Sequence, residues 1–265
     1  MSRLGERTLP IGLFRYSAYR LAEMKESFVK IAMWSGPRNL STALMYSFAN
    51  RGDMRVVDEP FYAAYLAQTG VLHPMRDKVI ASQNVDPQAV IKTLLEDDQS
   101  VHHYQKHMTQ HMLPSIERDW LTKVKNVFLI RHPARILASW ANKHDTPSLA
   151  DIGFEQQLEI FEQVGAQGKS VTVIDASDIR AHSEASLRAL CAALELEWDP
   201  AMVSWGVGLK PFDGVWAKHW YDAVHRSSGF ASAEDDLPEL RGELALINER
   251  ALPLYERLAA HKISI

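Results

Sequence analysis

The segment Ile31-Ala-Met-Trp-Ser-Gly-Pro-Arg-Asn-Leu-Ser-Thr42 combines three structural signals in a short length of chain. Its apolar beginning predicts a buried strand, Ser35-Gly-Pro37 predicts a tight turn, and Ser41 and Thr42 predict the start of a helix. Backbone N–H groups, the positive end of a helix and the Arg38 guanidinium would then meet at one point, which suits a phosphate or sulfate group. The segment therefore predicts an anion-binding loop between a strand and a helix.

This loop differs from the loops that bind nucleoside triphosphates. No lysine precedes Ser41 or Thr42, so the ending of the GxxxxGK[ST] pattern is missing. The loop therefore favours an anion other than a magnesium-bound triphosphate. The simpler alternative is an ordinary strand-to-helix turn with a capping serine and an exposed arginine.

Strand and helix signals alternate along the chain. The predicted strands are Val29–Trp34, Met54–Val57, Ser100–Tyr104, Val124–Ile130 and Ser170–Ile174. The predicted helices are Leu40–Ala49, Pro87–Leu95, Pro133–Lys143, Phe154–Val164, Ser183–Leu194 and Leu237–His261, the last as one helix or a pair. This alternation predicts a three-layer α/β/α fold around a central parallel sheet. Residues 205–233 lack clear periodicity and are predicted to form a long functional loop.

Length, charge and cysteine content exclude several classes of protein. The 265 residues predict one large α/β domain, residues 28–265, after an N-terminal extension, residues 1–27. The formal net charge of −4 argues against a nucleic-acid partner, and no apolar run reaches the roughly 18 residues of a membrane helix. Cys191 is the one cysteine, so no internal disulfide can form, which fits a reducing compartment. We expect a cytoplasmic protein with neither a nucleic-acid nor a membrane partner.

Charged residues follow four of the predicted strands. They are Arg38, Glu59, Lys106 and Arg131, in chain order. Ligands of parallel α/β sheets bind beyond the carboxyl ends of the strands, so we expect these side chains to converge on one edge. Each also has an ordinary alternative as a helix cap, a solvated loop residue or a partner in a salt bridge.

A second anion-binding element gives the pattern its specificity. Arg131-His132-Pro133 ends a predicted strand, and Ser139 lies about two helical turns further on. Together with Pro37–Thr42, this element resembles the sulfotransferase superfamily, which uses 3′-phosphoadenosine 5′-phosphosulfate (PAPS) as donor. The resemblance implies a P-loop NTPase-like sulfotransferase fold and a donor held at two places. Arg131 and Ser139 would hold the 3′-phosphate, and the 5′-phosphosulfate would bind the loop residues Pro37, Arg38, Asn39, Leu40, Ser41 and Thr42.

The loop departs from the family pattern at two positions. Arg38 stands where lysine is usual in the family. Arginine also occurs there in bacterial members, and it keeps the positive charge. Leu40 stands in place of a glycine, which predicts a slightly different path for the loop backbone.

The resemblance also implies a general base and a cation at the reacting centre. Glu59 matches the position where several branches of the family place a glutamate base, with Asp58 and His107 as rivals. Lys106 and Arg38 would stabilise the leaving nucleotide. The histidines His102, His103, His107 and His111 lack a frame of carboxylates or cysteines, so we expect no metal site.

The late part of the chain contributes a predicted lid. Arg226, Ser227 and Ser228 would contact the 3′-phosphate, and Trp34 would stack on adenine unless it packs in the core. The implied acceptor is a small molecule that offers a hydroxyl or an amine; a sugar, an alcohol and a phenol remain open, as does the oligomeric state, a homodimer included. The alternative functions are a P-loop kinase for a small molecule or nucleotide, and a non-catalytic nucleotide-binding relative.

Overall fold

Five parallel strands form the centre of the molecule. The computed structural model describes residues 28–96, 100–141 and 146–265. The strands are β1 (Lys30–Ser35), β2 (Met54–Asp58), β3 (His102–Met108), β4 (Lys125–Ile130) and β5 (Val171–Asp175). They pair in the order β2-β3-β1-β4-β5, all parallel, so the predicted α/β class and parallel sheet are confirmed.

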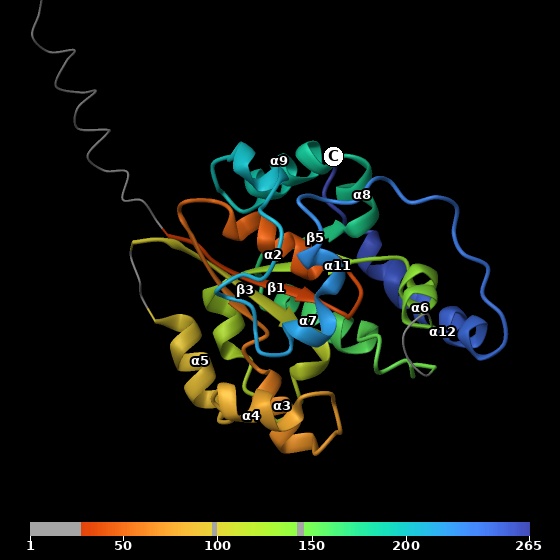
Figure 1. Cartoon of the computed structure of the whole chain (residues 1–265), viewed down its shortest axis with the longest axis horizontal. Helices are drawn as coiled ribbons and strands as arrows, with labels where there is room; N and C mark the ends of the chain where they lie inside the picture. Colours follow the sequence, from red (N-terminus) through yellow and green to blue (C-terminus); the bar gives the residue numbers. More distant parts are fainter. Residues whose placement is uncertain (1–27, 97–99, 142–145) are drawn as a thin grey trace, which may run out of the picture.

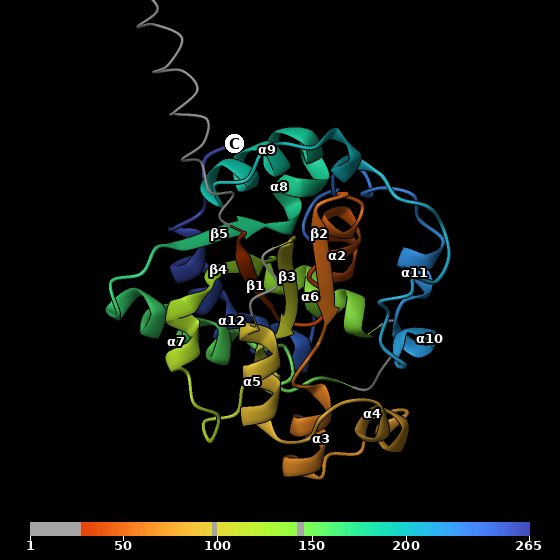
Figure 2. The ribbon, with the colours of Figure 1, turned by 90° about the vertical axis from the view of Figure 1, so that its left-hand side faces the viewer.

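Helices cover both faces of this sheet (Figures 1 and 2). One hydrophobic core lies under α2 (Ser41–Ala49), α8 (Ala176–Ala181) and α9 (Ser183–Ala193), and it contains Cys191 as a buried free thiol. The other core lies under α5 (Pro87–Leu95), α6 (Pro133–Ala141), α7 (Phe154–Ala166) and α12 (Glu243–Ala259). These two cores make the three layers that the sequence predicts.

The remaining elements are short. They are α3 (Tyr62–Thr69), α4 (Arg76–Ser82), α10 (Ala217–Trp220) and α11 (Asp222–His225), with the 3₁₀ turns η1 (Thr109–His111), η2 (Asp119–Lys123) and η3 (Pro200–Val203). No helix in the described ranges has the length and apolar content that crossing a bilayer requires. The predicted extension, residues 1–27, lies outside the described residues.

Two boundaries differ from the sequence prediction in ways that affect the site. Strand β3 starts at His102 and runs to Met108, not from Ser100 to Tyr104, so Lys106 and His107 lie inside the strand. The strand tolerates this lysine because two carboxylates pair with its ammonium. The last helix begins at Glu243 rather than Leu237, after a stretch without regular structure. The predicted end of the helix at Lys143 lies outside the described residues.

Candidate active site

The loop between β1 and α2 has an unusual backbone. Arg38 and Leu40 both adopt positive φ, at 62° and 68°, a region that costs a non-glycine residue about 1–2 kcal/mol. Leu40 therefore takes the left-handed conformation that glycine adopts readily. A Cβ at Gly36 would lie 2.3 Å from the carbonyl oxygen of Ile152, so glycine is required there. The loop path is thus set by close packing and by two strained residues.

The first turn of α2 has no side-chain cap. Leu40 is the N-cap residue, and it provides no side-chain hydrogen bond. Helix α2 starts at Ser41, as predicted, so neither Ser41 nor Thr42 is a capping serine or threonine. The first turn also holds no acidic residue. The buried Asn39 donates from Nδ2 to the Leu129 carbonyl at 3.4 Å, which fixes the loop to β4. The positive end of α2 is therefore left available to an anion.

The two predicted anion-binding elements lie together. Arg38 Nε donates to Ser139 Oγ at 3.0 Å, and Arg131 Nη1 donates to the carbonyl oxygen of Arg38 at 2.6 Å. Burial and the nearby Arg131 charge lower the pKa of Arg38. The guanidiniums of Arg38 and Arg131 thus meet at the carboxyl ends of β1 and β4.

An acidic residue that the sequence reading missed lies beside them. Glu234 receives hydrogen bonds from Arg131 Nη2 and from Arg180 Nη1, the latter at 2.5 Å, and Arg135 Nε lies 3.4 Å from its other oxygen. Burial raises the pKa of Glu234, but the three arginines lower it overall. No local pattern in the sequence links residue 180 to residue 234, so only the tertiary fold reveals this cluster.

A second cluster surrounds Lys106 on the same face of the sheet. Its ammonium donates to Asp58 Oδ1 at 2.9 Å, to Glu59 Oε1 at 2.6 Å and to Tyr221 Oη at 2.6 Å. An ammonium has three N–H donors, so all of them are used. In this geometry Lys106 orients carboxylates and has no donor left for a leaving group, in contrast to the role expected from the sequence.

The two carboxylates of this cluster, Asp58 and Glu59, differ in how many of their oxygens accept hydrogen bonds. Asp58 is fully buried and also accepts from Gly214 N at 3.1 Å and from the Tyr221 hydroxyl at 2.8 Å. Burial raises the pKa of Asp58 to about 6 against the opposing effect of Lys106. Glu59 has only Oε1 in hydrogen bonds within the described structure, and its side chain is 10% exposed. Glu59 is thus the better placed of the two to accept a proton.

Glu59 is also held in a strained conformation. Its φ is 41°, and its backbone N–H donates to the carbonyl oxygen of Lys106 at 2.9 Å. His111 Nδ1 lies 4.0 Å from Glu59 Oε2, and this nitrogen is buried without a hydrogen bond. The ring of His111 stacks on Tyr62 at 4.6 Å between centroids. Backbone strain of this kind concentrates at functional sites, which supports Glu59 as a candidate functional residue.

Trp34 and His107 lie buried on the opposite face of the sheet, which agrees with the core alternative for Trp34. His107 is 2% exposed and stacks on Trp34 at 4.4 Å, and burial lowers its pKa to about 3. Trp34 is fully buried, and its Nε1 donates to Asn126 Oδ1 at 3.0 Å. Successive residues of a strand point to opposite faces, so His107 points away from the side of Lys106. Neither His107 as base nor Trp34 as adenine platform fits this packing.

The predicted lid residues, Arg226, Ser227 and Ser228, have no hydrogen bond to the predicted 3′-phosphate site in the described structure. Ser227 Oγ accepts from Trp205 Nε1 at 3.3 Å and donates to the Val224 carbonyl, while Arg226 and Ser228 are exposed. No hydrogen bond of the described residues joins this segment to Arg131. In the same portion of the chain, no three His, Cys, Asp or Glu side chains gather as metal ligands would.

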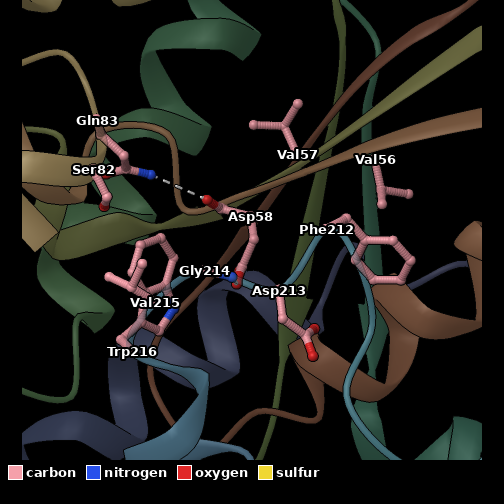
Figure 3. Close-up of a pocket in the computed structure, with 10 residues that line it drawn as sticks. All are labelled: Val56, Val57, Asp58, Ser82, Gln83, Phe212, Asp213, Gly214, Val215 and Trp216. Atoms are coloured by element: carbon pink, nitrogen blue, oxygen red, sulfur yellow. Dashed lines mark hydrogen bonds between the residues drawn. The ribbon is translucent and has the colours of Figure 1, made fainter.

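A cavity opens beside the Lys106 cluster, along the outer strand β2 (Figure 3). Its volume is about 300 Å³. It is lined by Val56, Val57, Asp58, Ser82, Gln83, Phe212, Asp213, Gly214, Val215 and Trp216. The walls are therefore mixed, with apolar side chains around two carboxylates.

Comparison with known proteins gives the family. A model described as a sulfotransferase domain matches residues 29–262. Among solved structures, the sulfotransferase domain from the curacin biosynthetic pathway is similar with a TM-score of 0.53 and 15% identity, over 89% of this chain and 99% of that one. A sulfotransferase from Alicyclobacillus acidocaldarius gives 0.52 and 12%, over 90% and 98%. These two structures share the fold of this chain.

Two curated proteins of Arabidopsis thaliana are closer in sequence. They are named branched-chain-amino-acid aminotransferase-like proteins 1 and 2, and they are 38% and 35% identical over 235 residues. The match covers 87% of this chain but 42% and 41% of theirs, so the chain spans about two fifths of their length. Their names describe much longer proteins, whereas the sulfotransferase model covers nearly all of the described domain. The chain belongs to the sulfotransferase domain family.

Proposed function

We propose that this protein transfers a sulfuryl group from 3′-phosphoadenosine 5′-phosphosulfate to a hydroxyl or amine of a small-molecule acceptor. The observation that carries the proposal is the junction of Arg38, Ser139 and Arg131, because it joins two anion-binding elements into one site. A donor with a phosphosulfate at one end of its ribose and a phosphate at the other needs such a pair of positive points. The uncapped start of α2 supplies further N–H donors for the phosphosulfate.

The chemistry requires one bond to form at sulfur and one to break. The acceptor oxygen or nitrogen attacks the sulfur in line, and the bond from sulfur to the bridging phosphate oxygen breaks. The electron pair leaves with adenosine 3′,5′-bisphosphate, whose added charge the Arg38 guanidinium stabilises. The proton of the acceptor passes to Glu59 Oε2, the carboxylate oxygen that forms no hydrogen bond among the described residues.

Lys106 then has a positioning role. It holds Glu59 Oε1 at 2.6 Å and pairs with the adjacent Asp58, so the Glu59 carboxylate is fixed in orientation beside a buried positive charge. Asp58 is a poorer base, because both of its oxygens already accept hydrogen bonds. The buried unpaired Cys191 fits work in a reducing compartment, and we place the activity in the cytoplasm.

Calorimetry tests the proposed donor. We expect adenosine 3′,5′-bisphosphate to bind and ATP with magnesium to bind far more weakly, since the loop lacks the P-loop lysine. Binding of ATP with magnesium alone would favour the kinase alternative.

A second experiment separates an enzyme from a nucleotide-binding relative. Labelled donor is incubated with alcohol, carbohydrate and amine acceptors, using the wild type and Glu59→Gln. We expect the variant to lose about 10²–10⁴-fold in turnover while it keeps its affinity for the bisphosphate. Unchanged turnover in the variant would remove Glu59 from the mechanism.

A further inference from the structure

Three arginines from two regions of the chain surround one carboxylate. Arg131 follows β4, Arg135 lies in the first turn of α6, and Arg180 lies in the last turn of α8. All three point to Glu234, whose side chain is 7% exposed, and Ser177 Oγ adds a contact at 3.4 Å. Donors from several elements therefore meet at a single buried point near the carboxyl ends of β4 and β5.

The segment that carries Glu234 is attached through these arginines and, at its two ends, through Phe230 and Leu240, which pack against the two cores. Residues 230–241 contain no helix or strand and cross the surface between α11 and α12, the long blue stretch in Figure 1. Arg180 Nε donates to the Ser232 carbonyl and Arg135 Nη2 donates to the Asp235 carbonyl. Most side chains of the segment are exposed, with Leu237 at 51%. Residues 231–239, between these two anchors, bury little apolar surface, so this part of the segment can move away from the arginines.

The charges around Glu234 do not balance. Three guanidiniums face one carboxylate, and Asp235 is the further acidic group near enough to act on Arg180. Arg131 Nε is buried without a hydrogen-bond partner. A phosphate monoester brings nearly two negative charges and three acceptor oxygens, so it would satisfy this set of donors better than a carboxylate does.

The arginine cluster around Glu234 is joined to the loop that follows β1. Arg131 uses Nη1 for the Arg38 carbonyl and Nη2 for Glu234, so one guanidinium spans both places. We propose that Arg131, Arg135 and Arg180 form a phosphate-binding site, which Glu234 occupies as an internal substitute for the ligand. In a protein with the proposed function, which this inference extends, the ligand is the 3′-phosphate of the donor. Its binding displaces Glu234 and releases residues 231–239 from the site.

Replacement of Glu234 by glutamine tests the competition. We expect Glu234→Gln to bind adenosine 3′,5′-bisphosphate about tenfold more tightly than the wild type, because the competing charge is gone. Affinity for adenosine 5′-monophosphate, which lacks the 3′-phosphate, should not change. Glu239→Gln is the matched control, since Glu239 lies in the same segment, is exposed and pairs only with Arg241 among the described residues. Equal affinities of wild type and Glu234→Gln for the bisphosphate, weaker binding by the variant, or a gain for both nucleotides alike would overturn the proposal.

Two further measurements test the proposed phosphate site if nucleotide binding is not detected or if Glu234→Gln folds poorly. Arg180→Gln should bind the bisphosphate about tenfold more weakly and the monophosphate as the wild type does. The melting temperature in increasing inorganic phosphate should rise more for Glu234→Gln than for the wild type. If no variant binds either nucleotide, the proposed donor is wrong, and the phosphate titration alone decides the site. Equal rises in wild type and Glu234→Gln would then overturn it.

Discussion

Replacement of Lys106 by methionine tests the electrostatic account of the buried cluster. The substitution keeps most of the side-chain volume and removes the ammonium, which is 1% exposed and contacts two carboxylates within 2.9 Å. Breaking a buried ion pair from one side costs about 3–5 kcal/mol, because the remaining charge is left uncompensated. We expect a loss of this size in the free energy of unfolding at pH 8.

The loss should depend on pH in a defined direction. The pKa of Asp58 is already raised to about 6 in the folded protein, above its ordinary 3.8, so the folded state binds a proton that the unfolded state releases. Stability from this group is therefore present at low pH and falls as pH rises from about 3.8 to 6. Without Lys106 the folded pKa rises further, so the variant should keep losing up to about 1.4 kcal/mol per pH unit above pH 6.

Urea unfolding at pH 6 and pH 8 measures both effects. The gap between Lys106→Met and wild type should be wider at pH 8, and adding Asp58→Asn to the variant should narrow it. A variant within about 1 kcal/mol of the wild type at pH 8, with the same pH slope, would refute the reasoning.

Three further outcomes are expected. Burial lowers the pKa of His107 to about 3 from 6.5, so its contribution to the free energy of unfolding is full above pH 6.5 and falls by about 1.4 kcal/mol per pH unit down to about pH 3. In His107→Gln, the free energy of unfolding in urea should therefore fall less steeply with decreasing pH, by that amount. An unchanged slope would contradict burial of a neutral ring. Gly36→Ala should cost about 1–3 kcal/mol in thermal unfolding because its Cβ meets the Ile152 carbonyl, whereas Gly52→Ala, with open space around it, should cost far less. Tyr221→Phe should lose about 1–3 kcal/mol in urea unfolding, since it leaves a buried ammonium donor unpaired; a midpoint equal to the wild type would count against the cluster.

Local signals in the sequence predict the parallel sheet and the tight turn between β1 and α2. Apolar runs broken by Ser35-Gly-Pro37 and by Arg131-His132-Pro133 mark the ends of β1 and β4, because turn residues act over a few positions. The parallel order then brings Arg38 and Arg131 to one edge. The contact of Arg38 with Ser139 follows from the same geometry.

Other parts of the site depend on contacts between distant segments. The link of Lys106 to Tyr221 spans 115 positions, and that of Arg131 to Glu234 spans 103. The prediction for His107 failed for a local reason, however. The polar residues after Tyr104 predict a loop, whereas they continue β3, and in a strand His107 and Lys106 point to opposite faces.

The distance along the chain between the parts of the Lys106 cluster has a consequence for biosynthesis. Asp58 is joined to Gly214 and to Tyr221 across 156 and 163 positions, so the amino-terminal strands leave the ribosome long before these partners exist. Until Gly214 and Tyr221 have been synthesised, the side chains of Asp58 and Glu59 remain hydrated and without these partners. The Lys106 cluster can therefore assemble only after the carboxyl-terminal part of the chain has folded back, and its completion coincides with the slow, long-range closure of the fold.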